Sequence, residues 1–218
     1  DRGTESTALG KLGLLYYERG HHKEALEHYE QGLAIAREIG HEIHEGVSLC
    51  NIALLHQAQG RFTQAEVRFQ EAIKIARRID NRRNEGVCLG NLALIYRTQG
   101  RNRESKDHYQ KALKVAREIG NKRSEGVNLG NLGDFLFHQE NLAAAEKCLR
   151  ESIAICDQAY PIAAGAFRGT LALIIARKGH LEEAQQELKT GELQIRGVYR
   201  WELAKFLCKK ALVAQIAE

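Results

Sequence analysis

The sequence predicts an all-α fold, and more specifically a right-handed α-solenoid of helix-turn-helix repeats. The first observation is a period of 40 residues, because Glu-Gly-Val recurs at 45–47, 85–87 and 125–127. The second is that apolar residues within a period follow the i, i+3, i+4, i+7 spacing of one helix face. The third is that the polar–apolar alternation of a half-buried strand does not persist anywhere. Such a period is typical of repeat architectures, in which helix pairs stack on their neighbours.

The composition fits a folded helical protein and excludes several other classes. Of the 218 residues, 44% are hydrophobic, which is too many for a disordered chain. No apolar run approaches the length of a membrane-spanning helix. The net charge of +4 is small for a nucleic-acid-binding domain. Because the first residue is Asp1 and an encoded chain begins with Met, we expect the sequence to be a piece of a longer protein.

We expect a single domain, residues 1–218, made of five repeats and part of a sixth. The predicted segments are 8–47, 48–87, 88–127, 128–167, 168–206 and 207–218. The last segment repeats the first-helix pattern at Leu207, Leu212 and Ile216, but the chain stops where the turn would begin. It is therefore either a capping helix or the first helix of a sixth repeat, and the sequence leaves both open.

The third repeat shows how its two helices are assigned. The apolar face of its first helix consists of Leu89, Leu92, Ala93 and Tyr96. Gly100 and the polar residues after it interrupt this pattern. A second helical pattern resumes with Ser105, Tyr109, Ala112, Leu113 and Ala116. Gly120 follows, in the position where a left-handed glycine commonly ends a helix.

Glycines mark the turns of the other repeats. The turn glycine recurs at Gly20, Gly60 and Gly100. It is replaced by Glu140 in the fourth repeat and returns at Gly179, one residue short of the period. We place the missing residue in a surface loop around Tyr160 and Pro161, where a deletion costs least. Other glycines lie inside first helices, at Gly13, Gly90, Gly130 and Gly133, which predicts a close approach between neighbouring helices.

This pattern resembles the tetratricopeptide repeat, a helix-turn-helix unit of about 34 residues. The third copy carries the resemblance most fully, in Asn91-Leu92-Ala93, Tyr96, Gly100, Ser105, Tyr109 and Ala112. The likeness extends over roughly residues 8–207. With its longer period and its Leu-Gly-Asn segments, the chain is similar to the repeats of the Leu-Gly-Asn spindle-orientation adaptor, kinesin light chains and large bacterial signalling proteins. The resemblance implies a scaffold that binds other proteins.

A second face of each first helix is a candidate binding surface. At about 100° per residue, Asn91, Leu94 and Thr98 point away from the packed face and would line the concave side of a solenoid. The peptide-binding candidates are Lys11, Asn51, Leu54, Asn91, Leu94, Arg97, Asn131, Asp134, His138 and Arg177. Amide side chains can satisfy both the N–H and C=O groups of an extended peptide, and leucines would accept its apolar side chains. The alternative is that the asparagines bond neighbouring helices or face solvent.

The resemblance adds that grooves of this family often place asparagine at this position against a ligand's backbone or carboxylate. Capture of a terminal carboxylate is nevertheless disfavoured here, because it needs several basic residues in a cluster. Only Lys11 and Arg177 are suitable on this face, and they lie far apart in the repeat order.

Basic residues and cysteines receive structural interpretations. A basic group in the middle of the chain comprises Arg77, Arg78, Arg82, Arg83, Lys122 and Arg123. Because they lie near segment ends, where cations favour a helix C-terminus, we interpret them as structural, with a basic edge for an acidic partner as the alternative.

The cysteines are Cys50, Cys88, Cys148, Cys156 and Cys208. We interpret all five as small buried hydrophobes in a reducing compartment, which favours a cytoplasmic location.

We expect no enzyme activity, metal or cofactor. Of the nine histidines, His41 and His44 share a predicted loop, and none has the spacing that metal ligation requires. His56 occupies the place of Tyr96 in its own repeat and is expected in the core. The serines that repeat in the chain are Ser48, Ser105, Ser124 and Ser152, and no nucleophile motif surrounds them.

We therefore predict a non-catalytic protein–protein interaction scaffold that binds a peptide or helical segment of a partner in its concave groove. The alternative is a sensor or regulatory segment of a larger bacterial signalling protein, which binds a small ligand or its own effector domain. A third hypothesis is a self-associating array. The expected partner is a protein, a peptide or an adjacent domain of the same chain, and neither a membrane nor nucleic acid is favoured.

Overall fold

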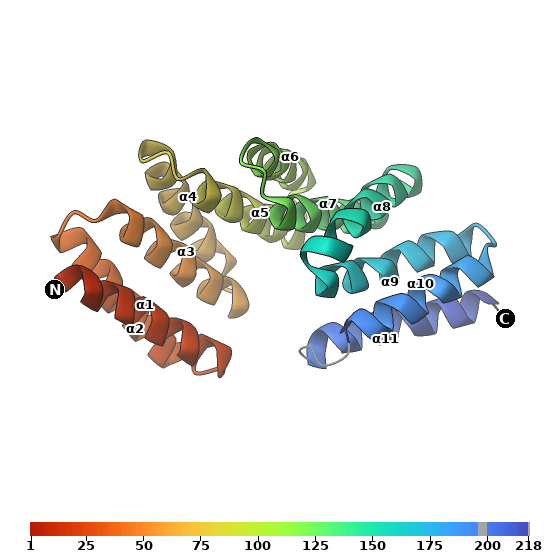
Figure 1. Ribbon diagram of the computed structural model, residues 1–218, viewed down its shortest axis with the longest axis horizontal. Helices are drawn as coiled ribbons and strands as arrows, with labels where there is room; N and C mark the ends of the chain where they lie inside the picture. Colours follow the sequence, from red (N-terminus) through yellow and green to blue (C-terminus); the bar gives the residue numbers. More distant parts are fainter. Residues whose placement is uncertain (196–199, 218) are drawn as a thin grey trace. The chain divides into compact units, whose positions relative to one another are not determined.

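The computed structural model describes residues 1–195 and 200–217, which form helices joined by short turns with no strand among them (Figure 1). The predicted all-α fold of helix-turn-helix repeats is therefore confirmed. The helices are α1 (Arg2–Glu18), α2 (His22–Glu38), α3 (Glu42–Ala58), α4 (Phe62–Arg78), α5 (Arg82–Thr98), α6 (Asn102–Glu118), α7 (Lys122–His138), α8 (Leu142–Ala159), α9 (Pro161–Arg177), α10 (Leu181–Ile195) and α11 (Arg200–Ala217).

The chain consists of two compact units, Asp1–Val115 and Ala116–Glu218. In the first unit α1 packs on α2 and α3 on α4, and each of these second helices also packs on the next first helix. The first helices α1, α3 and α5 contact one another in order. In the second unit α7 packs on α8 and α9 on α10, and α9 also contacts both α7 and α8. Within each unit the helix pairs thus stack as the period predicts.

The helix pairs begin before the predicted segments do. The helices α3, α5 and α7 start at Glu42, Arg82 and Lys122, whereas the predicted segments start at 48, 88 and 128. His44, which the sequence predicts to lie in a loop, therefore belongs to the first turn of α3. These first turns are polar and are fixed by caps, as where Asn81 Oδ1 accepts a hydrogen bond from the Asn84 backbone N–H at 3.1 Å. Apolar periodicity does not register such turns, so it places the helix start too late.

The turn positions follow the period closely. Gly20, Gly60 and Gly100 have φ angles of 79°, 73° and 73°. Glu140, which replaces this glycine in the fourth repeat, is held at a φ of 55°, a left-handed conformation that costs about 1 kcal/mol without glycine. The repeat is one residue shorter than the period at the place that the sequence predicts. Only Tyr160 separates α8 from α9, and Pro161 is the first residue of α9.

The core is formed by the face that the period predicts. Leu89, Leu92, Ala93 and Tyr96 are at most 3% exposed. His56 is also buried, as predicted from its repeat position. The glycines inside first helices mark close approaches: a Cβ added at Gly133 would lie 2.7 Å from Leu149 Cγ. These contacts place α7 and α8 close together and leave no space for a larger residue at Gly133.

The cysteines follow the prediction only in part. Cys50, Cys88 and Cys156 are buried free thiols, whereas Cys148 is half-buried and Cys208 is exposed. The expectation that all five are buried is therefore wrong for the last two. Burial raises the pKa of the Cys156 thiol, which keeps it protonated and unreactive. The exposure of Cys208 follows from the placement of α11.

The last helix packs differently from the first helices before it. Of the two helices before it, α11 lies more against the first helix α9 than against the second helix α10, whereas α3, α5 and α9 each contact the preceding second helix more than the preceding first helix. Phe206 is 2% exposed, and a Cβ added at Gly191 would lie 2.8 Å from its ring. Leu207, Leu212 and Ile216, which repeat the first-helix pattern, are 44%, 50% and 41% exposed. The small residues Gly169 and Gly191 admit the Phe206 ring, so the face of α11 that carries Phe206 is turned inward. The turn expected at Glu218 lies outside the described residues.

Candidate functional site

The predicted binding residues of the first unit lie on a surface formed by α1, α3 and α5. Asn51 and Leu54 on α3 and Asn91 and Leu94 on α5 are half-buried, whereas Lys11 on α1 is exposed. These repeat-equivalent positions are neighbours, because α1 contacts α3 and α3 contacts α5. We call this surface the inner stripe, and it comprises Lys11, Leu14, Glu18, Val47, Asn51, Leu54, Gln57, Val87, Asn91, Leu94 and Arg97.

The amide of Asn91 is held in place by its own helix. Its Nδ2 donates a hydrogen bond to the backbone oxygen of Val87, one turn earlier, at 3.0 Å. This bond uses one N–H of the amide and leaves Oδ1 and the second N–H for another partner. Leu94, one turn later, adds an apolar side chain that is also half-buried. The local arrangement therefore offers fixed polar atoms beside an apolar contact.

Two polar atoms at the edge of the inner stripe are buried without a hydrogen-bond partner. They are Nη1 of Arg97 on α5 and Oε1 of Gln57 on α3, which occupy the same position of the 40-residue period. One is a donor and the other an acceptor, and each unpaired buried group costs about 1–3 kcal/mol. Sequence reasoning included Arg97 but missed Gln57, although the period that relates the two residues could have found it.

The predicted residues of the second unit do not form an equivalent surface. On α7, Asn131 and Asp134 are half-buried and His138 is exposed. On α9, however, the corresponding Thr170 and Leu173 are only 2% and 5% exposed. The reason is α11, which packs on α9 and whose Lys209 Nζ donates to Thr170 Oγ1 at 2.6 Å.

Arg177 of the second unit is engaged within the protein. Its Nη1 donates to Glu140 Oε2 at 3.2 Å, and its guanidinium lies 5.0 Å from the centroid of the Phe137 ring. These contacts use the charge that was expected to serve a ligand. Of the ten predicted binding residues, the inner stripe therefore brings together the six from the first unit: Lys11, Asn51, Leu54, Asn91, Leu94 and Arg97.

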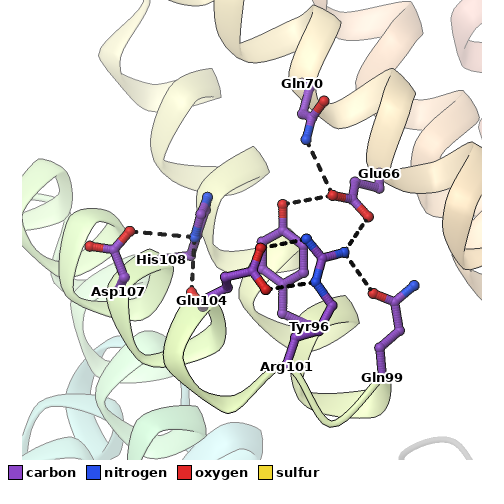
Figure 2. A network of polar contacts seen from close by, with 8 residues as sticks. All are labelled: Glu66, Gln70, Tyr96, Gln99, Arg101, Glu104, Asp107 and His108. Atoms are coloured by element: carbon purple, nitrogen blue, oxygen red, sulfur yellow. Dashed lines mark hydrogen bonds and ion pairs between the residues drawn. The ribbon is translucent and has the colours of Figure 1, made fainter.

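A dense polar cluster of the first unit joins α4 to the turn between α5 and α6 (Figure 2). Arg101 Nη1 donates to Glu66 Oε2 and Arg101 Nε donates to Glu104 Oε2, both at 2.7 Å. Tyr96 OH donates to Glu66 Oε1 at 3.0 Å, and the guanidinium lies 4.1 Å from the centroid of the Tyr96 ring. Burial raises the pKa of Tyr96, which keeps its hydroxyl protonated. Because the charges satisfy one another, we interpret the cluster as a clamp between helix pairs.

A recurring ion pair joins one helix pair to the next. The pairs are Arg37–Glu45, Arg77–Glu85 and Arg117–Glu125, with Nε to Oε1 distances of 2.9, 2.7 and 2.9 Å. Each arginine lies in the last turn of a second helix and each glutamate in the first turn of the following helix. The residues recur with the period, so the contact is part of the repeat itself.

The predicted basic group is used mainly in contacts within the protein. Arg78 pairs with Glu42, Arg82 with Glu85, and Lys122 with Glu125, while Arg123 lies 4.0 Å from the Tyr160 ring centroid. These contacts support the structural interpretation over a basic edge for a partner. The expected location at helix C-termini is right for Arg77 and Arg78 and wrong for Arg82 and Lys122, which begin α5 and α7. Ion pairing offsets the unfavourable interaction of a cation with a helix N-terminus.

The histidines and serines singled out by the sequence have structural contacts. The rings of His41 and His44 stack with centroids 3.9 Å apart, and the His44 backbone N–H donates to His41 Nδ1 at 3.3 Å, which caps α3. In the described ranges, 1–195 and 200–217, no three side chains gather that could hold a metal ion. Ser105 Oγ donates to the Ala93 backbone oxygen at 2.9 Å, a buried contact between the helices of one pair.

Comparisons with known proteins were made for both sequence and structure. Family models described as tetratricopeptide repeat match residues 6–39, 45–118 and 129–161. A comparison with curated protein sequences finds no match. No helix in the part of the chain that the structure describes combines the length and apolar character needed to cross a membrane.

Several solved structures share the fold. Aspartyl phosphate phosphatase F from Bacillus subtilis is 16% identical with a TM-score of 0.76, over 100% of this chain and 61% of that one. Kinesin light chain repeats from Podosopora anserina are 18% identical with a TM-score of 0.67, over 89% of this chain and 96% of that one. NprR in complex with its cognate peptide NprX is 21% identical with a TM-score of 0.71, over 99% of this chain and 61% of that one. The chain thus spans about three fifths of the phosphatase and of NprR.

Proposed function

Because this chain belongs to the tetratricopeptide repeat family, we propose that it is a non-catalytic protein-interaction scaffold whose inner stripe holds a peptide or a helical segment of a partner. The observation that carries the proposal is the inner stripe itself. Asn51 and Asn91 present half-buried amides on neighbouring first helices, with Leu54 and Leu94 one turn further on. This surface alternates groups that bind a backbone with groups that bind apolar side chains.

The proposed mechanism depends on a surface that is formed before the partner arrives. The hydrogen bond from Asn91 to Val87 fixes one amide, so little side-chain entropy remains to be lost on binding. An extended peptide has unpaired N–H and C=O groups, and the free atoms of such amides can satisfy both. The leucines exclude water from these bonds and select the partner's side chains by their size.

The fold shared with NprR supports this proposal. That protein was solved with its cognate peptide NprX, so a helical-repeat fold of this kind can carry a peptide. At 21% identity the likeness concerns the fold, and the residues that would bind a peptide here come from this chain alone.

The second candidate is a sensor or regulatory segment of a larger signalling protein, which binds a small ligand or its own effector domain. It is favoured by the coverage, since this chain spans 61% of the NprR chain, and that protein therefore has further residues beyond the shared repeats. A ligand that binds only the folded state raises the melting temperature, and above its Kd the rise grows with the logarithm of the ligand concentration. Screening nucleotides, amino acids and sugars by thermal shift, with no protein partner present, separates this candidate from the scaffold.

Peptide selection provides the test of the scaffold. The immobilised chain is used to select from a phage-displayed library of random twelve-residue peptides, and selected peptides are synthesised for affinity measurement. Replacing Asn51 and Asn91 together by Ala should weaken binding about tenfold, because two backbone hydrogen bonds are lost. The matched control replaces two exposed amides on second helices, Gln64 and Gln110, by Ala. Undiminished binding by the Asn51/Asn91 variant would show that the amides do not hold the peptide.

A further inference from the structure

We propose that the inner stripe selects a partner segment that carries an acidic side chain, and that Arg97 receives its carboxylate. The inference rests on the proposed function and adds the chemical class of the partner to it. The structure describes five half-buried arginines, namely Arg68, Arg82, Arg97, Arg101 and Arg168. Arg97 is the one among them without a carboxylate within ion-pair distance.

The surroundings of Arg97 favour a charged partner. Its Nη1 is shielded from solvent and has no acceptor, and the side chain begins one turn after the half-buried Leu94. The Nη1 group has lost its hydration without gaining a hydrogen bond, which is costly. A carboxylate matches the planar fork of arginine and can accept two hydrogen bonds from it. The arrangement therefore fits an acidic side chain better than a neutral acceptor.

Gln57 extends this site along the neighbouring helix. Its Oε1 is buried without a donor, at the position of α3 that corresponds to Arg97 of α5. An acidic residue in a peptide has a backbone N–H close to its carboxylate, and neighbouring residues supply more. Arg97 thus needs a hydrogen-bond acceptor and Gln57 needs a donor. A peptide with an acidic side chain provides both, in its carboxylate and its backbone N–H groups.

The charge of the inner stripe agrees with this assignment. Its ionisable residues are Lys11 and Glu18 on α1 and Arg97 on α5, which gives an excess of one positive charge. The acidic residue Glu18 lies on α1 and Arg97 lies on α5. The helix α3 contacts both of them. A single arginine is sufficient for one side-chain carboxylate, whereas terminal carboxylate capture needs a basic cluster. We therefore assign the site to an Asp or Glu side chain.

The test uses the phage library described above, in which the carboxyl end of each peptide is fused to the coat protein. Because no peptide in this library has a free carboxyl terminus, any selection for a carboxylate must act on Asp or Glu side chains. The wild-type chain should select peptides with a recurrent Asp or Glu, and Arg97→Gln should select peptides without it. Arg103→Gln, which removes an exposed arginine from α6, is the matched control and should keep the preference. Circular dichroism melting confirms that each variant is folded.

A second measurement tests whether the carboxylate and Arg97 interact. One selected peptide is synthesised with its acidic residue and with the corresponding amide. Wild-type protein should bind the amide peptide about tenfold more weakly, and Arg97→Gln should bind both peptides equally, because a hydrogen-bonded charge pair is worth roughly this much. Selection of peptides without acid preference, or an equal loss for both proteins, would overturn the assignment while leaving the scaffold intact. Recovery of no peptide at all would instead count against the proposed function.

Discussion

Arg77 and Glu85 form a hydrogen-bonded ion pair across the turn between α4 and α5, with Arg77 Nε 2.7 Å from Glu85 Oε1. The glutamate is only 3% exposed, so its carboxylate depends on the protein for its hydrogen bonds. Arg82 supplies a second cation to the same carboxylate. The contact lies at the junction between two helix pairs. The stability that is lost when the contact is removed therefore reports on how strongly the pairs are joined.

Removing this carboxylate is expected to destabilise the chain. Glu85→Ala should lower the free energy of unfolding by about 2 kcal/mol, because a buried, doubly paired acceptor is lost. The matched variant is Glu45→Ala at the preceding junction, where the side chain is 19% exposed and pairs with Arg37. It should cost clearly less. Urea unfolding followed by circular dichroism gives both values, and equal losses would show that burial and the second cation contribute nothing.

The third junction should make stability depend on acid. Burial raises the pKa of Glu125, but hydrogen bonds from Lys122 and Arg117 outweigh burial and hold that pKa below its ordinary value. A depressed folded-state pKa contributes stability above the unfolded value of about 4.5, and this contribution is lost as the pH falls through the folded value. Glu125→Gln should therefore be less stable than wild type at pH 7, and the difference should shrink below about pH 4.5. A difference that is constant from pH 7 to pH 3 would contradict the ion pair.

The stacked histidines predict a second pH dependence at milder acidity. Burial lowers the pKa of His44, and the nearby His41 lowers it further. The neutral ring is favoured in the fold, so its contribution is complete above the unfolded value of about 6.5 and is lost as the pH falls through the lower folded value.

Two substitutions test this pair. His44→Gln should flatten the stability curve between pH 7 and pH 5, measured by urea unfolding. His41→Asn supplies the cap that Asn81 and Asn121 provide in the later repeats, and should keep stability at pH 7 while reducing its loss at pH 5, because the ring that helps to lower the pKa of His44 is removed. An unchanged curve in both variants would show that protonation of His44 is not coupled to folding.

Glycines inside first helices predict opposite effects of one substitution. Gly133→Ala should destabilise by about 1–3 kcal/mol, because the added Cβ would meet Leu149 Cγ at 2.7 Å. Gly10→Ala should stabilise by about 0.5–1 kcal/mol, because nothing lies within 4 Å of the added carbon and alanine favours the helix. Thermal unfolding of the two variants checks both signs. A loss at Gly10 would show that α1 packs more tightly than these distances indicate.

The repeat period was enough to predict the fold and, in α3 and α5, which residues face the core and which belong to the inner stripe. Leu92 and Tyr96 are buried, and Asn91 and Leu94 are half-buried, because these positions depend only on helix geometry and on the paired helix. The predicted boundaries were less accurate. First turns such as that of α5 are held by Asn81 and by ion pairs, and neither contributes to an apolar pattern.

Features that depend on one particular neighbour could not be predicted in this way. The face that α11 turns inward follows from the space beside Gly169 and Gly191, which only the assembled helices reveal. The burial of Thr170 is a consequence of that placement. Likewise, sequence could place Arg97 on the inner stripe, but the burial of its Nη1 without a hydrogen-bond partner is a property of the folded chain.

The contact of α1 with α3 and of α3 with α5 also sets a length for whatever lies across them. Packed helices have axes about 8–10 Å apart, so the distance from α1 to α5 is roughly 20 Å. An extended chain advances about 3.3 Å per residue, and about six residues would therefore cross all three helices. A partner that reaches both Lys11 and Arg97 need present no more than a short linear motif, of a size that loops and chain ends commonly expose.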